Sequence, residues 1–344
     1  MARNLSVLLP THLNVLSETT SRIDPRKVIA HTKGQPFDML CNHLIFDENE
    51  IGKYVSKTAF RFAIVRDPMK QALSALTYYT NVYPSQELLN GLRKHQPDPI
   101  NGFLQHPEDF ASVPSPAWSF VNNRMSIDLG FDLENFKSSK KDTTKKKAFL
   151  KKLEKQFDVI LISDYFDESL VLLRRMLRWS LKDIIYLKVN TGKQIAKSSA
   201  WNKVPRINKT TIDRFRQWAA IDYDLYEYFL QIFKTKLENE FSFRDEVKTF
   251  REIQQDVRDF CSNKTNIGDL RIQHNLWTKE FLVSKTDCKL MDLMEMDIID
   301  VARSLQIDRY RSQLKQQQQQ RRQHHHHYHH HQKQQQYKNN ERSS

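Results

Sequence analysis

The chain has little glycine and cysteine, and it lacks any long apolar run. Its seven glycines are scattered through 344 residues, so none belongs to a phosphate-binding G-x-x-x-x-G-K-[ST] loop. No segment reaches the ~20 apolar residues that a membrane-spanning helix needs. Residues 1–20 lack the basic-then-apolar pattern of a signal peptide. Taken alone, these absences suggest a cytosolic protein.

The three cysteines, Cys41, Cys261 and Cys288, show no spacing typical of zinc ligands. Histidine is concentrated in the C-terminal tail, where the composition changes at Gln313 to Gln, His, Arg and Lys, with QQQQQ and HHHHYHHH runs. Such a segment has too little apolar surface to bury, which predicts a disordered tail over residues 312–344. The histidines could chelate a metal weakly in vitro, but no functional metal site is expected.

Positive charge is what the chain has in excess. The net charge is +13 and the pI is near 9.5, which favours anionic partners such as a nucleotide, an acidic lipid or a polyanionic sugar. Nine lysines lie between Lys137 and Lys155, and they are typical of a solvated loop and helix face. No RNA-binding, zinc-finger or helix-turn-helix signature is present, so no nucleic-acid partner is expected.

The most informative segment is FRFAIVRDPMKQALSALTYY, residues 60–79. Its apolar run, residues 62–65, predicts a short buried strand that ends at Arg66. Asp67 can cap a following helix, and Pro68 suits the first turn of that helix. An arginine at this junction can grip a phosphate with its planar fork, and the helix N-terminus adds partial positive charge. Ser74 could donate a second hydrogen bond; the alternative is a surface arginine capped by Asp67.

The rest of the chain predicts an α/β protein. Strands are expected at residues 158–162 and 184–189, and helices at 48–55, 145–156 and 211–241, the last as one long aromatic-rich helix. Residues 245–310 favour helix. The acidic cluster of Asp164, Asp167 and Glu168 indicates the start of a helix and a scaffold role rather than paired catalytic carboxylates.

The segment around Arg66 resembles the 3′-phosphate-binding segment of Golgi carbohydrate sulfotransferases. Two further blocks, CNHLIF at residues 41–46 and FDVILISDYFDESLVLLRRMLRWSLKDIIYLKVN at residues 157–190, follow the order and spacing of the galactose-3-O-sulfotransferase family. The resemblance covers about residues 4–311, which we interpret as one domain followed by the tail. It implies a fold like that of P-loop NTPases, a mostly parallel sheet with helices on both faces.

The resemblance also implies a donor site. The co-substrate would be 3′-phosphoadenosine-5′-phosphosulfate, with no metal, and Arg66 and Ser74 would hold its 3′-phosphate. Asn190 matches an asparagine that closes the donor region in the family. The arginine that often follows is replaced by Gly192, so the resemblance is weaker there.

On the acceptor side, the resemblance implies that His43 is the base for a galactose 3-hydroxyl of a galactosylceramide-like glycolipid or of a glycan. A neutral imidazole suits proton abstraction from an alcohol near neutral pH. Asn42 could orient the acceptor or the imidazole. The structural alternative for His43 is a core or surface histidine bonded to backbone. The functional alternative is a non-catalytic relative that binds anionic glycans or nucleotide.

Members of the family work at the lumenal side of the Golgi membrane, where an N-terminal helix absent from this chain anchors them. That setting would allow glycosylation at the sequons of Asn4, Asn208 and Asn263. It would also make a Cys261–Cys288 disulfide plausible, leaving Cys41 as a small buried residue beside His43.

One family element is missing. A loop for the 5′-phosphosulfate, roughly LKTHK-x-x-[GS]-[ST]-[ST], precedes the N-L-S-V phrase in the family, whereas this chain begins MARNLSVLLP. We therefore expect the first strand and this loop to be absent and the chain to be truncated at its N-terminus. Losing such a charge clamp typically costs orders of magnitude in rate, so the chain would be either a shortened form of an active enzyme or a protein of little activity.

Overall fold

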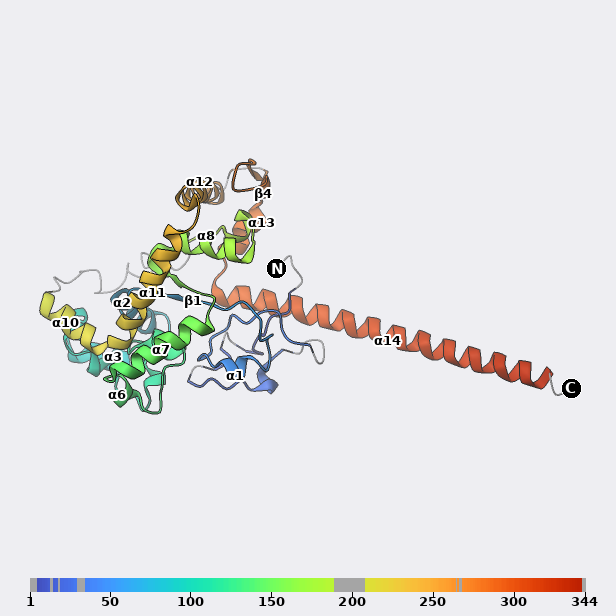
Figure 1. Cartoon of the computed structure of the whole chain (residues 1–344), viewed down its shortest axis with the longest axis horizontal. Coiled ribbons are helices and arrows are strands. Elements are labelled where there is room, and N and C mark those ends of the chain that lie inside the picture. The colour runs from blue at the N-terminus through green and yellow to red at the C-terminus, as the bar shows by residue number, and fades with distance from the viewer. Residues whose placement is uncertain are drawn as a thin grey trace.

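The structure is a computed structural model that describes residues 5–12, 15–17, 19–29, 35–188, 208–263, 265 and 268–341 (Figure 1). Its strands are β1 (Phe62–Val65), β2 (Val159–Ile162), β3 (Leu270–Ile272) and β4 (Phe281–Val283). Its α-helices are α1 (Glu48–Ile51), α2 (Pro68–Asn81), α3 (Gln86–Lys94), α4 (Pro99–Gln105), α5 (Arg124–Asp128), α6 (Phe136–Ser139), α7 (Thr143–Gln156), α8 (Phe166–Leu177), α10 (Lys209–Trp218), α11 (Ala220–Glu238), α12 (Phe243–Ser262), α13 (Lys285–Met291) and α14 (Glu295–Glu341). Short 3₁₀ helices are η1 (Pro25–Lys27), η2 (Pro107–Phe110), η3 (Pro116–Trp118), η4 (Ser163–Tyr165) and η5 (Leu181–Ile184).

The two strands predicted first, β1 and β2, lie side by side. They pair in parallel over four positions, from Phe62 with Val159 to Val65 with Ile162, so their carboxyl ends share one edge. Strand β2 is buried along its length. Strand β1 is less buried than its sequence predicts, because Phe62 and Ile64 are 44% and 47% exposed. The parallel sheet is therefore small: among the described residues it has two strands.

The third strand predicted at residues 184–189 is wrong over the part that is described. Ser180 and Asp183 form a capping box that turns the chain into η5, and residues 185–188 belong to neither a helix nor a strand. The side chain of Gln254 takes the place of a neighbouring strand, since it accepts from the Tyr186 amide at 3.2 Å and donates to the Tyr186 carbonyl at 3.3 Å.

The long helix predicted at residues 211–241 is two helices, α10 and α11, which meet at Ala219. Asn123 causes the break, because its side chain bonds to both helices. Its Oδ1 accepts from the amides of Ile221 and Asp222 at 3.0 and 3.1 Å, and its Nδ2 donates to the Trp218 carbonyl at 3.1 Å. Asn123 is 1% exposed and lies far away in sequence, so the local pattern did not reveal the junction.

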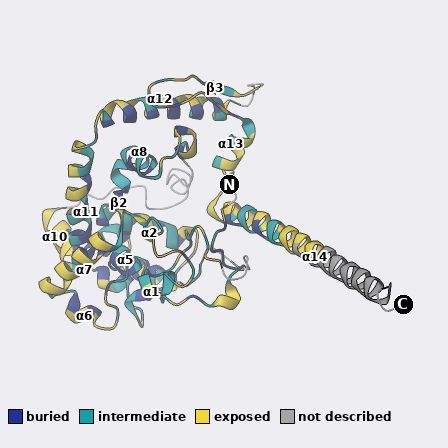
Figure 2. Ribbon diagram, turned by 45° about the vertical axis from the view of Figure 1, so that its right-hand side comes forward, coloured by how far each residue is buried: buried dark blue, intermediate teal, exposed yellow. Residues whose placement is uncertain are grey.

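The main core forms where helices α7, α8, α11 and α12 pack around β2. It includes Leu153, Ile162, Leu172, Phe233 and Phe250, and in Figure 2 the buried residues of α12 line the side that faces α8. A second cluster joins α2, α3, α4 and α10. The two clusters hold β1, β2 and the start of α2 in place, which fixes the edge at which Arg66 lies.

The C-terminal part contains a hairpin and a disulfide. Strands β3 and β4 pair antiparallel, which the helix-favouring sequence of residues 245–310 did not predict. The expected bond between Cys261 and Cys288 is present and joins α12 to α13, with a Cα–Cα distance of 5.5 Å.

The tail predicted to be disordered is instead helical and belongs to α14, which runs to Glu341 and projects from the body (Figure 1). The segment holds no glycine or proline, and Gln, Arg and Lys have helix propensities close to that of alanine. The lack of apolar surface favours disorder, whereas local propensity favours helix. The expected domain boundary at residues 311 and 312 falls inside this helix.

Among the described residues, no helix has the length and apolar character that crossing a bilayer requires.

Candidate active site

The carboxyl edge of β1 and β2 carries the segment that predicts an anion site. Asp67 caps α2, as expected, and accepts from the Lys70 amide at 2.9 Å, with Pro68 in the first turn. Asp164, which follows β2, accepts from the Asp67 amide at 2.9 Å and from Lys70 Nζ at 2.6 Å. Burial alone would raise the pKa of Asp164, but these bonds outweigh burial and lower it. Asp164 therefore ties the two strand ends together.

The other acidic residues of this cluster also belong to the scaffold. Arg251 of α12 donates to Asp167 at 2.9 Å and to Glu168 at 2.7 Å. The interpretation of the cluster as scaffold, rather than as paired catalytic carboxylates, is consistent with these ion pairs.

Arg66 lies half-buried at the same edge, and its backbone amide donates to Met125 Sδ at 3.3 Å. Within the described part of the chain its guanidinium has no ion-pair partner, and it does not pair with Asp67. Ser74 is exposed on α2, one turn beyond Lys70 on the same face. A guanidinium with uncompensated charge beside a helix N-terminus has the chemistry of an anion site.

His43 and Asn42 lie on an extended segment that passes the N-terminal residues. His43 pairs as a parallel bridge with Val15, and its carbonyl accepts from Leu16 and Ser17 at 2.9 and 3.2 Å. Side chains alternate along such a segment: Asn42 is buried, whereas His43 and Cys41 are exposed. The expectation that Cys41 is buried is therefore wrong.

The imidazole of His43 has a carboxylate beside it that the sequence did not reveal. His43 Nε2 lies 3.4 Å from Oε1 of Glu295, the first residue of α14. The interaction with the Glu295 carboxylate raises the pKa of His43 above its ordinary value, although partial loss of water around the ring opposes this effect. Glu295 lies 252 positions away in sequence, and no local signal connects the two residues.

Helix α5 and the last turn of α2 lie near His43 and Glu295. Arg124 forms a bidentate pair with Asp128, with N–O distances of 3.0 and 2.7 Å, and both act electrostatically on His43. Burial raises the pKa of Tyr78, with smaller contributions from Tyr83 and Glu295. Because Tyr78 and Ser74 are four residues apart, they share a face of α2. Helix α2 therefore connects the Arg66 edge with the surroundings of His43.

The remaining predicted residues are two asparagines outside the described part of the chain and two on its surface. Asn4 and Asn190 are outside the described residues, so their roles stay predictions. Asn208 and Asn263 are exposed; Asn208 caps α10, and Asn263 accepts from Thr265 at the end of α12. Among the described residues, no group of three or more His, Cys, Asp or Glu side chains could hold a metal ion.

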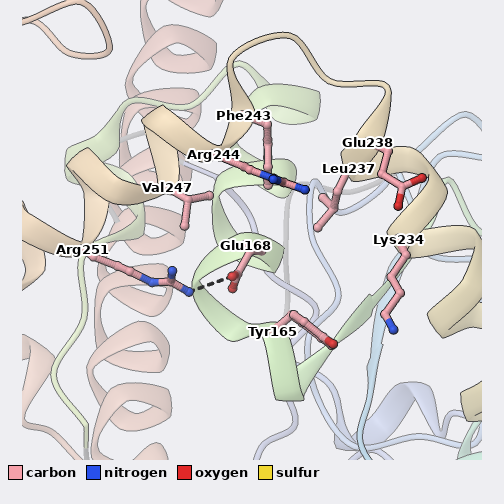
Figure 3. Close-up of a pocket in the computed structure, with 9 residues that line it drawn as sticks. All are labelled: Tyr165, Glu168, Lys234, Leu237, Glu238, Phe243, Arg244, Val247 and Arg251. Carbon is pink, nitrogen blue, oxygen red and sulfur yellow. Dashed lines mark hydrogen bonds and ion pairs between the residues drawn. The ribbon is translucent and has the colours of Figure 1, made fainter.

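A cavity of 390 Å³ lies between α8, α11 and α12, and Figure 3 shows its lining. It is lined by Tyr165, Glu168, Lys234, Leu237, Glu238, Phe243, Arg244, Val247 and Arg251. None of the residues predicted for the site is among them. The lining carries three basic side chains, Lys234, Arg244 and Arg251, and two acidic ones, Glu168 and Glu238, and Glu168 pairs with Arg251.

The parallel pair of β1 and β2, with helices packed around it, defines a mixed α/β protein. The family model described as Galactose-3-O-sulfotransferase matches residues 2–279. The chain belongs to the galactose-3-O-sulfotransferase family, which is a family of sulfotransferases.

Three relatives illustrate the match. The chain is 32% identical to galactose-3-O-sulfotransferase 2 of Mus musculus over 286 residues, which cover 79% of this chain and 68% of the relative. It is 29% identical to galactosylceramide sulfotransferase of Bos taurus over 230 residues, covering 66% and 51%. It is 30% identical to galactose-3-O-sulfotransferase 3 of Mus musculus over 199 residues, covering 58% and 43%. No solved structure gave a significant match.

Proposed function

We propose that this protein transfers sulfate from 3′-phosphoadenosine-5′-phosphosulfate to the 3-hydroxyl of galactose in a glycolipid or a glycan. The main support for this proposal is that the chain belongs to the galactose-3-O-sulfotransferase family. The names of the relatives, which include galactosylceramide sulfotransferase, support a galactose-containing acceptor. The arrangement at the carboxyl edge of β1 and β2 supports an anionic donor.

Arg66 is the central donor contact in this proposal. Its guanidinium would form two parallel hydrogen bonds with the 3′-phosphate, and Ser74 would donate a third from α2. Asn190 would close the donor region. The uncompensated charge of Arg66 among the described residues supports this role, because binding would not require breaking an existing ion pair.

His43 is the proposed base. The oxygen of the galactose 3-hydroxyl attacks the sulfur of the donor, and the bond from sulfur to the bridging phosphate oxygen breaks with its electron pair on the phosphate. The hydroxyl proton passes to His43. This chemistry depends on positioning and electrostatics, as phosphoryl transfer does. The exposure of the imidazole supports access for an acceptor, and the adjacent Asn42 would orient it.

The lumenal side of the Golgi membrane is the proposed location. The Cys261–Cys288 disulfide supports an oxidising compartment. The exposed asparagines of two sequons, Asn208 and Asn263, are accessible for glycosylation, which supports the same compartment.

Titration calorimetry with adenosine 3′,5′-bisphosphate tests the donor site. We expect binding by the wild type and at least tenfold weaker binding by Arg66→Ala, since a charge-assisted bidentate contact contributes about 1.5–3 kcal/mol. Adenosine 5′-phosphate, which lacks the 3′-phosphate, should bind the two proteins equally. Arg93→Ala, at an exposed arginine of α3, is the matched control.

Binding alone does not separate an enzyme from a non-catalytic relative. Sulfate transfer from the labelled donor to galactosylceramide and to a galactose-terminated glycan distinguishes the two. Donor binding without transfer to either acceptor would favour a protein that binds nucleotide or anionic glycans. No heat with the bisphosphate would contradict the proposal as a whole.

A further inference from the structure

Glu295 lies after the part of the chain that the family model matches, which ends at residue 279. Even so, its carboxylate is 3.4 Å from His43 Nε2. The side chains of His43 and Glu295 are 65% and 59% exposed, so an acceptor can approach the pair. The proposed base therefore has a partner that comes from the C-terminal helix α14.

The position of Glu295 is fixed by the way α14 docks. Gln306 accepts from the Val7 amide at 2.8 Å and donates to the Val7 carbonyl at 2.9 Å. Arg303 Nε donates to the Pro10 carbonyl at 2.9 Å. Ile299 is 7% exposed and packs against Leu9 and Ile29. The first turns of α14 are therefore held against the N-terminal segment by both polar and apolar contacts.

The same N-terminal segment also holds His43. Residues 7–10 contact α14, and residues 15–17 bond to the His43 backbone. In Figure 1 this segment passes beside the start of α14. One short stretch of chain thus sets the position of the imidazole and of the carboxylate, so their proximity is a consequence of the packing and not of a chance meeting of two mobile side chains.

The charged and titratable groups around the imidazole come from three other elements. Glu295 at the start of α14 and Asp128 of α5 raise the pKa of His43, whereas partial desolvation of the ring and Arg124 of α5 lower it. Tyr78 of α2 lies close enough to Glu295 to be affected by its charge, and Cys41 is the neighbouring exposed thiol. The carboxylate of Glu295 is the strongest of these influences.

We propose that Glu295 is a positioning residue for His43: its carboxylate accepts a hydrogen bond from Nε2–H, which leaves Nδ1 as the atom that takes the proton of the acceptor hydroxyl. This inference rests on the proposed function. A hydrogen bond at one ring nitrogen selects the tautomer in which the other nitrogen is the base. After transfer of the hydroxyl proton to Nδ1, the imidazolium is stabilised by the adjacent negative charge.

The pairing is tested on the full chain by NMR titration of ring-labelled histidines, with the His43 signal assigned from its absence in His43→Gln. In Glu295→Gln, the pKa of His43 should fall by about half a unit, the size expected for an exposed ion pair. Glu295→Asp should retain part of the effect. Asp297→Asn is the matched control, because it removes one charge from the same turn of α14 at an exposed residue. Equal titration of His43 in Glu295→Gln and Asp297→Asn would overturn the pairing.

The catalytic consequence is read from the pH dependence of sulfate transfer. The acid limb of kcat/KM should move to lower pH by the same half unit in Glu295→Gln. At neutral pH, kcat should fall about tenfold with an unchanged KM for the donor. A shifted NMR titration with an unshifted acid limb would overturn the positioning role. Absence of transfer by the wild type would contradict the proposed function, while the NMR comparison would still decide whether Glu295 pairs with His43.

Discussion

At the scale of single residues, the charged side chains divide into those held by partners in the scaffold and those that remain accessible. Asp164, Asp167 and Glu168 are all engaged by cations or backbone amides, so they hold the scaffold. Arg66 has no ion-pair partner within the described residues. The imidazole of His43 remains exposed, although the Glu295 carboxylate lies beside it. The contrast separates the residues that stabilise the fold from those available to a substrate.

His43→Ala should lower kcat for sulfate transfer at least a hundredfold, because a general base typically contributes a factor of about 10²–10⁴. The affinity for adenosine 3′,5′-bisphosphate should stay the same, since the imidazole does not contact the donor phosphates in the proposed arrangement. His274→Ala, at an exposed histidine near the β3–β4 hairpin, serves as control. Transfer within threefold of wild type would exclude His43 as the base.

Asp222 is a buried carboxyl whose effect on stability depends on pH. It accepts from the amide and hydroxyl of Ser126 at 2.8 and 2.6 Å, and burial raises its pKa to about 6 from 3.8. Below pH 3.8 the carboxyl is protonated in both the folded and the unfolded chain. Between about pH 4 and 6 the folded chain keeps a proton that the unfolded chain loses, so the free energy of unfolding falls as pH rises.

Asp222→Asn should remove this dependence. A shift of about two units corresponds to about 3 kcal/mol, so the free energy of unfolding of the wild type, relative to that of the variant, should fall by up to about that amount between pH 4 and 7. Urea unfolding at several pH values measures the difference. Asp256→Asn, at an exposed residue of α12, should show no such trend, and a difference that does not change with pH would contradict the assignment.

At the scale of elements, the sequence predicted what local patterns determine. The apolar runs gave β1 and β2, and Asp67 with Pro68 gave the start of α2, because each depends on neighbours within a few residues. The break at Ala219 and the loss of the third strand depend on Asn123 and Gln254, which lie far away in sequence. For the same reason Arg66 could be proposed from its segment, whereas Glu295 could be found only from the folded chain.

The junction of α10 and α11 gives a prediction at this scale. Asn123→Ala removes bonds to the Ile221 and Asp222 amides and to the Trp218 carbonyl, which should lower the free energy of unfolding by about 3 kcal/mol. Asn123 also has φ of 52°, a conformation that costs alanine roughly 1–2 kcal/mol. Asn123→Gly keeps that conformation accessible and should therefore be less destabilising than Asn123→Ala.

Urea unfolding of the two variants separates the lost bonds from the backbone effect. Asn90→Ala, at an exposed asparagine of α3, controls for removal of a surface amide. If Asn123→Gly were as stable as the wild type, the side-chain bonds would not hold the junction.

At the scale of the whole molecule, the C-terminal part of the chain is attached to the body at two places. The Cys261–Cys288 disulfide joins α13 to α12, and the contacts of Gln306 and Ile299 join α14 to the N-terminal segment. Helix α14 begins four residues after α13 ends, so both attachments act on the placement of Glu295. The proposed site is thus assembled from the central strands and from both ends of the described chain.

The disulfide gives the prediction that belongs to this scale. Its two cysteines are 27 positions apart, and closing a loop of that size contributes about 3–4 kcal/mol through the reduced entropy of the unfolded chain. The double variant Cys261→Ala, Cys288→Ala should lose about that amount in urea unfolding, and the amides of α13 should exchange faster with solvent, because α13 is then tied to α12 by packing alone. Cys41→Ala, at the exposed free thiol, should match the wild type in both measurements. Unchanged exchange in α13 would mean that the hairpin and α14 hold this helix without the cross-link, and the placement of Glu295 would then depend on the N-terminal segment alone.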